Sequence, residues 1–179
     1  SKEPMTAVGM GCLYTKTHNG RALKNVDEIR TELMSQFYYD HHHKFENLVL
    51  DGLQMEGKVL IIDCHSFPKF PLPYELDQRN DRAEFCLGTD TFHTHYEIRD
   101  FTKRFLENEG YGVAINRPFS GSIVPMEFYQ KDKRVQSIMI EIRRDLYMDE
   151  IAGTKSSEFE DMKNLMGKLI YELDTKFSV

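Results

Sequence analysis

The chain has 179 residues, a formal charge of −6 and 40% hydrophobic residues, a balance typical of one globular domain with a sizeable core. Its acidic balance, without a block of Lys or Arg, argues against binding to a nucleic-acid backbone, because such binding needs a basic surface. No apolar run is long enough to span a bilayer and no signal peptide is recognisable, so we expect a cytoplasmic domain whose partner is a small molecule or a protein.

The first predicted elements are a turn and two helices. Residues His18–Arg21 have the composition of a turn. Between residues 26 and 53 apolar side chains recur at helical intervals, with a break near Tyr38–Asp40. We therefore predict two helices in series, with Asn25 as the N-cap and Gly57 as the stop.

A buried strand with chemically active residues at its end follows. The aliphatic run Val59–Ile62 leads directly into Asp63, Cys64, His65 and Ser66. Such a run predicts a strand covered on both faces, and open α/β sheets bind ligands beyond the carboxyl ends of these strands. The alternative is that His65 satisfies a loop carbonyl and Asp63 caps a turn. A nucleophilic Cys64 thiolate is a further option, although apolar surroundings would raise the pKa of the thiol.

Strands and helices alternate through the rest of the chain. Residues 66–82 contain three prolines and predict a long loop, which in a compact domain is often functional. Residues 84–88 and 111–115 are predicted strands on either side of a helix over 96–109. A stripe of Met and Leu over 157–177 predicts a long amphipathic helix that covers its own domain. The fold class is therefore α/β, with a mixed, mainly parallel sheet flanked by helices.

Glu141 stands inside the predicted strand over 135–142. A carboxylate there loses hydration on burial, so it needs a cation, a metal or a proton. Such a site raises the pKa toward neutrality, as a general base in hydrolysis requires. The alternatives are an ion pair with Arg143 or Arg144 and a place on an exposed edge strand. Arg144 is also a candidate for binding a substrate carboxylate with two parallel hydrogen bonds.

The histidine run His41–His43 resembles a metal site at first sight. Successive helical residues diverge by about 100°, so the three imidazoles cannot all face one ion, and at most one or two of them are functional. The alternative for His41 and His42 is a cluster on a solvated surface or turn. His93 and His95 stand near a predicted helix start, where capping or surface roles are usual. His93 is a secondary candidate for the functional site.

Several motifs occur in a fixed order along the chain: Tyr39–His43, Ile62–Ser66, Cys86–Asp90 with Phe92–Thr94, Gly110–Tyr111 leading to Asn116–Gly121, and Ile140–Glu150. Together they resemble the N-formylglutamate amidohydrolase family. The resemblance is collinear and spans most of the chain between residues 9 and 150.

The resemblance implies an α/β fold related to zinc-dependent exopeptidases. It implies hydrolysis of N-formyl-L-glutamate, or a similar N-acyl acidic amino acid, to formate and glutamate in histidine degradation. Zinc would be the cofactor, with His65 as a metal ligand and Glu141 acting on the metal-bound water. The expected substrate contacts are Arg144, Asn116, Ser66 and His43, the last of which ends a tyrosine-rich stretch like that of the family. The expected partner is a small-molecule substrate, not a nucleic acid or a membrane, and the oligomeric state is unknown.

One departure from the family pattern concerns the metal. Family members carry a Pro-His-x-Gly stretch near the N-terminus that looks like the source of the other ligands, and this sequence contains none. One histidine cannot hold catalytic zinc, which takes three protein donors and water. We therefore expect residues 1–179 to form a single α/β domain that lacks the N-terminal part of the family fold. The alternative function is a noncatalytic domain that binds an acidic ligand and has lost the metal site.

Overall fold

One continuous helical segment replaces the two predicted helices. The computed structural model describes residues 9, 11–23 and 29–177, so the expected N-cap Asn25 lies outside the described residues. Helix α2 (Arg30–Leu33), the π-helical turn η1 (Met34–Tyr39) and helix α3 (Asp40–Glu56) follow one another directly.

The predicted break near Tyr38–Asp40 is therefore wrong. Tyrosine and aspartate are weak helix formers but do not interrupt the backbone hydrogen bonds as proline does, and the chain only widens to a π turn there. Helix α3 ends at Gly57, whose φ of 75° lies in the left-handed region that glycine adopts without a steric penalty.

The central sheet has the strand order β1-β4-β2-β3. Its strands are β1 (Val59–Phe67), β2 (Phe85–Gly88), β3 (Val113–Ile115) and β4 (Val135–Arg143). β1 pairs with β4 in parallel, as does β2 with β3, whereas β2 and β4 are antiparallel. The predicted α/β fold with a mixed, mainly parallel sheet is confirmed.

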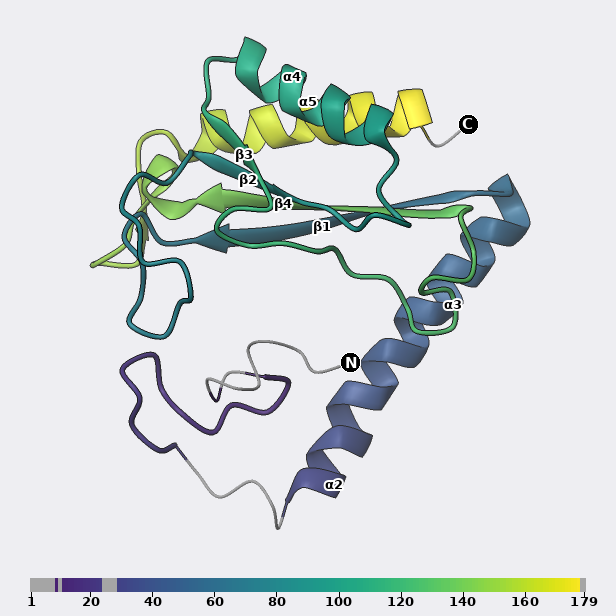
Figure 1. Ribbon diagram of the computed structural model, residues 1–179, viewed down its shortest axis with the longest axis horizontal. Coiled ribbons are helices and arrows are strands. Elements are labelled where there is room, and N and C mark those ends of the chain that lie inside the picture. Colours follow the sequence, from purple (N-terminus) through teal and green to yellow (C-terminus); the bar gives the residue numbers. More distant parts are fainter. Residues whose placement is uncertain (1–8, 10, 24–28, 178–179) are drawn as a thin grey trace.

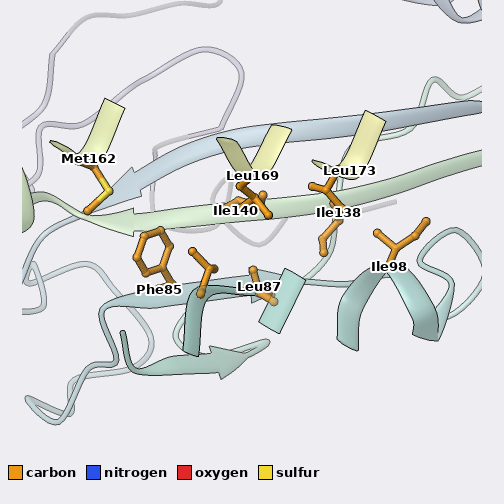
Figure 2. Close-up of a cluster of buried hydrophobic side chains, with 9 residues drawn as sticks. Phe85, Leu87, Ile98, Ile138, Ile140, Met162, Leu169 and Leu173 are labelled. Atoms are coloured by element: carbon orange, nitrogen blue, oxygen red, sulfur yellow. The ribbon is translucent and has the colours of Figure 1, made fainter. Parts of the chain in front are cut away.

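Two helices cover one face of this sheet, α4 (Tyr96–Asn108) and α5 (Phe159–Phe177) (Figure 1). Their apolar side chains meet those of the strands in the larger core (Figure 2). The fully or nearly buried members of this core are Phe85, Leu87, Ile98, Leu106, Ile138, Ile140, Met162, Leu169 and Leu173. The Met and Leu stripe of the C-terminal helix therefore packs on its own domain, as its spacing predicts.

A smaller core lies on the opposite face. Val49 and Leu53 of α3 pack near Val135, at the start of β4, with Val59 and Ile61 of β1 against the same cluster. These contacts cover the amino-terminal halves of β1 and β4. Figure 1 accordingly shows α3 beside the end of the sheet at which β1 begins. The carboxyl halves of the two strands carry the polar residues on this face.

The remaining elements are short. The predicted turn at His18–Arg21 is confirmed, since the N–H of Gly20 donates to the carbonyl oxygen of Thr17 at 2.9 Å. After β4 come a 3₁₀ turn η2 (Arg144–Leu146) and the two-stranded sheet of β5 (Met148–Asp149) and β6 (Thr154–Lys155). No helix in the described part of the chain has the length and apolar character needed to cross a membrane.

Candidate active site

Two residues far apart in the sequence meet near the carboxyl ends of β1 and β4. The parallel register places His65 of β1 beside Glu141 of β4. Side chains at paired positions of neighbouring strands lie on the same face, and successive side chains alternate between faces. Because Ile140 belongs to the core under α5, Glu141 and His65 belong to the opposite face, where α4 and α5 do not cover them.

Glu141 is 6% exposed, and its Oε2 atom has no hydrogen-bond partner within the described residues. Burial raises the pKa of this carboxyl group from 4.5 to about 7. The charges of Asp63 and Glu75 act in the same direction, whereas those of His65 and Arg144 lower it. A carboxyl group with a pKa near neutrality can take a proton from water and release it again during a reaction.

Asp63 holds the imidazole of His65. Its Oδ1 atom lies 2.8 Å from Nε2 of His65, and the two side chains are 19% and 51% exposed. A carboxylate bound to one ring nitrogen orients the imidazole and determines which nitrogen carries the proton. The alternative in which Asp63 caps a turn is therefore wrong, since the strand extends to Phe67 and keeps both side chains on one face.

The two arginines after Glu141 have separate partners. Arg144 donates from Nε to Oγ of Ser66 at 3.2 Å and from Nη2 to the carbonyl oxygen of Ser66 at 3.1 Å. Arg143 instead pairs with Asp145, with Nε and Oδ1 2.7 Å apart. Neither arginine forms an ion pair with Glu141 within the described ranges. The alternative in which Glu141 is paired with Arg143 or Arg144 is therefore wrong.

Two of the predicted substrate-binding residues, His43 and Asn116, form no described contact with this cluster. His43 is exposed on α3, and no hydrogen bond or ion pair of the described residues connects it to β1 or β4. Asn116 follows β3, and its side-chain amide is bound to Thr89, accepting from N–H and donating to Oγ1 at 2.8 Å each. Both roles stay predictions.

His93 has a structural role. It is fully buried, its Nδ1 lies 2.7 Å from the carbonyl oxygen of Val135, and its Nε2 accepts the N–H of Gln130 at 2.8 Å. Both ring nitrogens are thus used inside the protein. The prediction that His93 is a secondary candidate for the site is wrong. Its imidazole instead links Gln130, ahead of β4, to Val135, the first residue of β4.

The cysteines near the cluster are poor nucleophiles. Cys64 is exposed as a residue, but partial desolvation of its thiol raises the pKa of that group, and the charge of Asp63 raises it further. Burial also raises the pKa of Cys86, whose thiol donates to the carbonyl oxygen of Phe119 at 3.2 Å. Because the thiolate is the reactive form of cysteine, neither position is suited to nucleophilic attack.

The predicted zinc site lacks a full set of ligands in the part of the chain that the structure describes. Within these residues there is no group of three or more His, Cys, Asp or Glu side chains that could hold a metal ion. Among the described residues His65 is the one imidazole at the cluster, with Asp63 bound to it and Glu141 beside it in the register. Since catalytic zinc takes three protein donors, these residues alone do not complete a catalytic zinc site.

A family match and similar solved structures relate the chain to known proteins. Residues 1–148 match the family described as FGase, N-formylglutamate amidohydrolase. A similar solved structure is the N-formylglutamate amidohydrolase from Ralstonia eutropha JMP134, with a TM-score of 0.81 and 25% identity over 97% of this chain and 64% of that one. The gene product Atu2144 from Agrobacterium tumefaciens shares the fold, with a TM-score of 0.57 and 20% identity over 89% of this chain and 62% of that one. The chain thus spans about 64% and 62% of the lengths of these two relatives. No curated protein matches the chain.

Proposed function

The chain belongs to the N-formylglutamate amidohydrolase family, and from this premise we propose that it hydrolyses the amide of N-formyl-L-glutamate or of a similar N-acyl acidic amino acid. The products are formate and glutamate, and the reaction serves histidine degradation. The observation that supports this proposal is the buried Glu141 carboxyl group beside His65, with one oxygen that has no partner in the described residues.

Glu141 acts as the general base in this proposal. It accepts a proton from the attacking water, whose oxygen forms a bond to the acyl carbon. The bond between that carbon and the amide nitrogen then breaks, and the proton passes from Glu141 to the nitrogen of the leaving amine. A pKa of about 7 suits both transfers, because the group is then neither too strong nor too weak an acid for the working pH.

Arg144 binds the carboxylate of the substrate. Its guanidinium is half-buried and is held by both oxygens of Ser66. The plane that contains its N–H donors is therefore oriented before the substrate arrives. Ser66 therefore contributes through Arg144. His43 and Asn116 are retained as proposed substrate contacts on the strength of the family pattern.

Zinc is a separate part of the proposal, with His65 as one ligand oriented by Asp63. The metal content of the purified protein, measured by mass spectrometry for the wild type and His65→Ala, tests this part alone. Stoichiometric zinc in the wild type and its loss in the variant would support it.

The decisive experiment for the reaction is the variant Glu141→Gln. We expect the rate of formate release at saturating substrate to fall about 100-fold or more, because general-base catalysis typically contributes 10²–10⁴-fold. KM should change little, since the amide keeps the shape of the side chain. Formate release by the variant at the wild-type rate would reject the proposed role of Glu141.

A noncatalytic domain that binds an acidic ligand is the second candidate function. The observation that favours it is that no group of three metal ligands occurs among the residues described. Calorimetry separates the two: N-formylglutamate binding without zinc uptake and without formate release supports the binding domain.

A further inference from the structure

A buried ion pair fastens the long loop that follows β1. Arg82 and Glu75 are 8% and 7% exposed, and the guanidinium of Arg82 donates to the carboxylate of Glu75. The same guanidinium donates to the carbonyl oxygens of Pro68 at 3.1 Å and Asp77 at 2.9 Å. Arg82 therefore joins the beginning, the middle and the end of the loop, residues 68–82.

The carboxylate of Glu75 is also bound within the loop. Its Oε1 atom accepts the N–H of Leu72 at 3.0 Å. By contrast, Nε of Arg82 is buried and has no partner within the described residues. Burying two charges loses hydration that their attraction only partly offsets, so such a pair is weak evidence for stability. In some proteins a buried pair of charges serves to fix one geometry.

The ends of the loop are attached to the segment that follows Glu141. Nη1 of Arg143 donates to the carbonyl oxygen of Arg82 at 2.8 Å. The backbone N–H of Lys69 donates to Glu150 at 2.9 Å, and its Nζ lies 3.1 Å from Asp145. The loop is thereby held against the end of β4, next to the candidate active site.

The loop lies against the face of the sheet that carries the candidate site. The guanidinium of Arg82 lies over the ring of Phe67, 5.9 Å from its centroid. Phe67 stands two residues after His65 on β1, so its side chain lies on the same face as that of His65. The charge of Glu75 also contributes to the raised pKa of Glu141.

We propose that the buried Arg82–Glu75 pair is a positioning element that holds residues 68–82 as a wall of the proposed substrate site. Arg82 acts through the loop and does not touch the substrate. The substrate part of this inference rests on the proposed function, whereas the fastening of the loop does not.

Hydrogen exchange and kinetics on the full chain test both parts. Arg82→Lys keeps the charge but loses the planar fork that reaches three partners, and Glu75→Gln removes the charge of the acceptor. We expect amide exchange in residues 68–82 to rise about tenfold or more in both variants, while exchange in β1 and β4 stays at the wild-type rate. KM for N-formylglutamate should rise about tenfold, with kcat within about twofold of the wild type.

Arg79→Ala is the matched control. Arg79 lies in the same loop and pairs with Asp77, but its side chain is 61% exposed, so its loss should change neither exchange nor KM. If the chain does not hydrolyse the substrate, the dissociation constant of N-formylglutamate from calorimetry takes the place of KM.

Three results would overturn the inference. Wild-type exchange of residues 68–82 in both Arg82→Lys and Glu75→Gln would show that the pair does not hold the loop. Equal loosening of the loop and the whole sheet would show a general structural role. A looser loop with an unchanged KM or dissociation constant in Arg82→Lys would show that the loop is not a wall of the substrate site. Absence of formate release by the wild type would count against the proposed function alone.

Discussion

The guanidinium of Arg144 donates to both oxygens of Ser66, the hydroxyl at 3.2 Å and the carbonyl at 3.1 Å. The two residues stand at the ends of neighbouring parallel strands, so the sheet itself brings a cation to the carboxyl end of β1. This geometry makes the orientation of Arg144 dependent on Ser66.

Substituting these two residues should weaken substrate binding to different extents. Ser66→Ala removes one of the two hydrogen bonds to Arg144, so we expect KM to rise a few-fold, in line with about 1 kcal/mol for one such bond. Arg144→Lys should raise KM about 10- to 100-fold, because lysine cannot form two parallel hydrogen bonds to a carboxylate. Steady-state formate release measures both.

Arg134→Lys is the control for the arginine substitution. Arg134 pairs with Asp132 through two nitrogens but is 62% exposed and lies before β4, so KM should not change. A KM for Arg144→Lys equal to that of this control would show that Arg144 does not bind the substrate.

Removing the negative charge of Asp63 should slow the reaction. In Asp63→Asn the imidazole of His65 loses the carboxylate that orients it, and loss of such a partner typically costs 10- to 100-fold in activity. We expect kcat to fall by about that factor. Glu97→Gln provides a comparison, because Glu97 faces His95 at 3.5 Å on the exposed start of α4; its kcat should equal that of the wild type, and the same kcat in Asp63→Asn would contradict the prediction.

The raised pKa of Glu141 predicts how stability depends on pH. Because its pKa is about 7 in the folded protein against 4.5 for the ordinary group, the folded state binds more protons than the unfolded state between these values. The stabilising contribution is fully present below about pH 4.5 and is lost as the pH rises through 7. Over this interval it amounts to on the order of 3 kcal/mol.

Urea unfolding of metal-free protein between pH 5 and 8 measures this effect. The free energy of unfolding of the wild type should fall with rising pH relative to that of Glu141→Gln, whose amide does not titrate. Parallel pH profiles for the two proteins would show that Glu141 has an ordinary pKa.

The close approach of the loop after β3 to β2 predicts a steric limit at Gly88. A Cβ atom there would lie 2.3 Å from the carbonyl oxygen of Gly121 and 2.3 Å from Cε of Met139, and the backbone oxygen cannot move away as a side chain can. Gly88→Ala should lower the free energy of unfolding by about 1–3 kcal/mol.

Gly167→Ala is the matched control for this steric effect. Gly167 lies inside α5 and would meet nothing within 4 Å, so alanine should raise the free energy of unfolding by up to about 1 kcal/mol. Urea unfolding at one pH compares both variants, and equal stability of Gly88→Ala and the wild type would contradict the steric argument.

Periodicity and residue type alone predicted most of the elements. Three elements appear in the structure close to their predicted bounds: the strand of Val59–Ile62, the strand around Glu141 and the C-terminal helix. The two strands pack on a core with both faces and therefore carry runs of apolar residues, whereas the helix packs with one face and carries an apolar stripe. The break predicted at Tyr38–Asp40 is absent from the structure. A run of weak helix formers resembles a helix end in sequence, but without a proline the helical hydrogen bonds continue through it. The short strands β5 and β6 are too brief for a period to be recognised.

The candidate residues His65 and Glu141 could also be predicted from the sequence. Each stands in or at the end of an apolar strand, where burying a polar side chain costs free energy unless it has a partner or a function. Their juxtaposition could not be predicted, because it depends on the register between two strands that lie 76 positions apart. The contacts of Asp63 with His65, of Ser66 with Arg144 and of Glu75 with Arg82 are likewise tertiary. Local sequence determines which side chains are buried or exposed along an element, whereas the pairing of strands and the path of a loop, which depend on packing of the whole chain, decide which of those side chains meet.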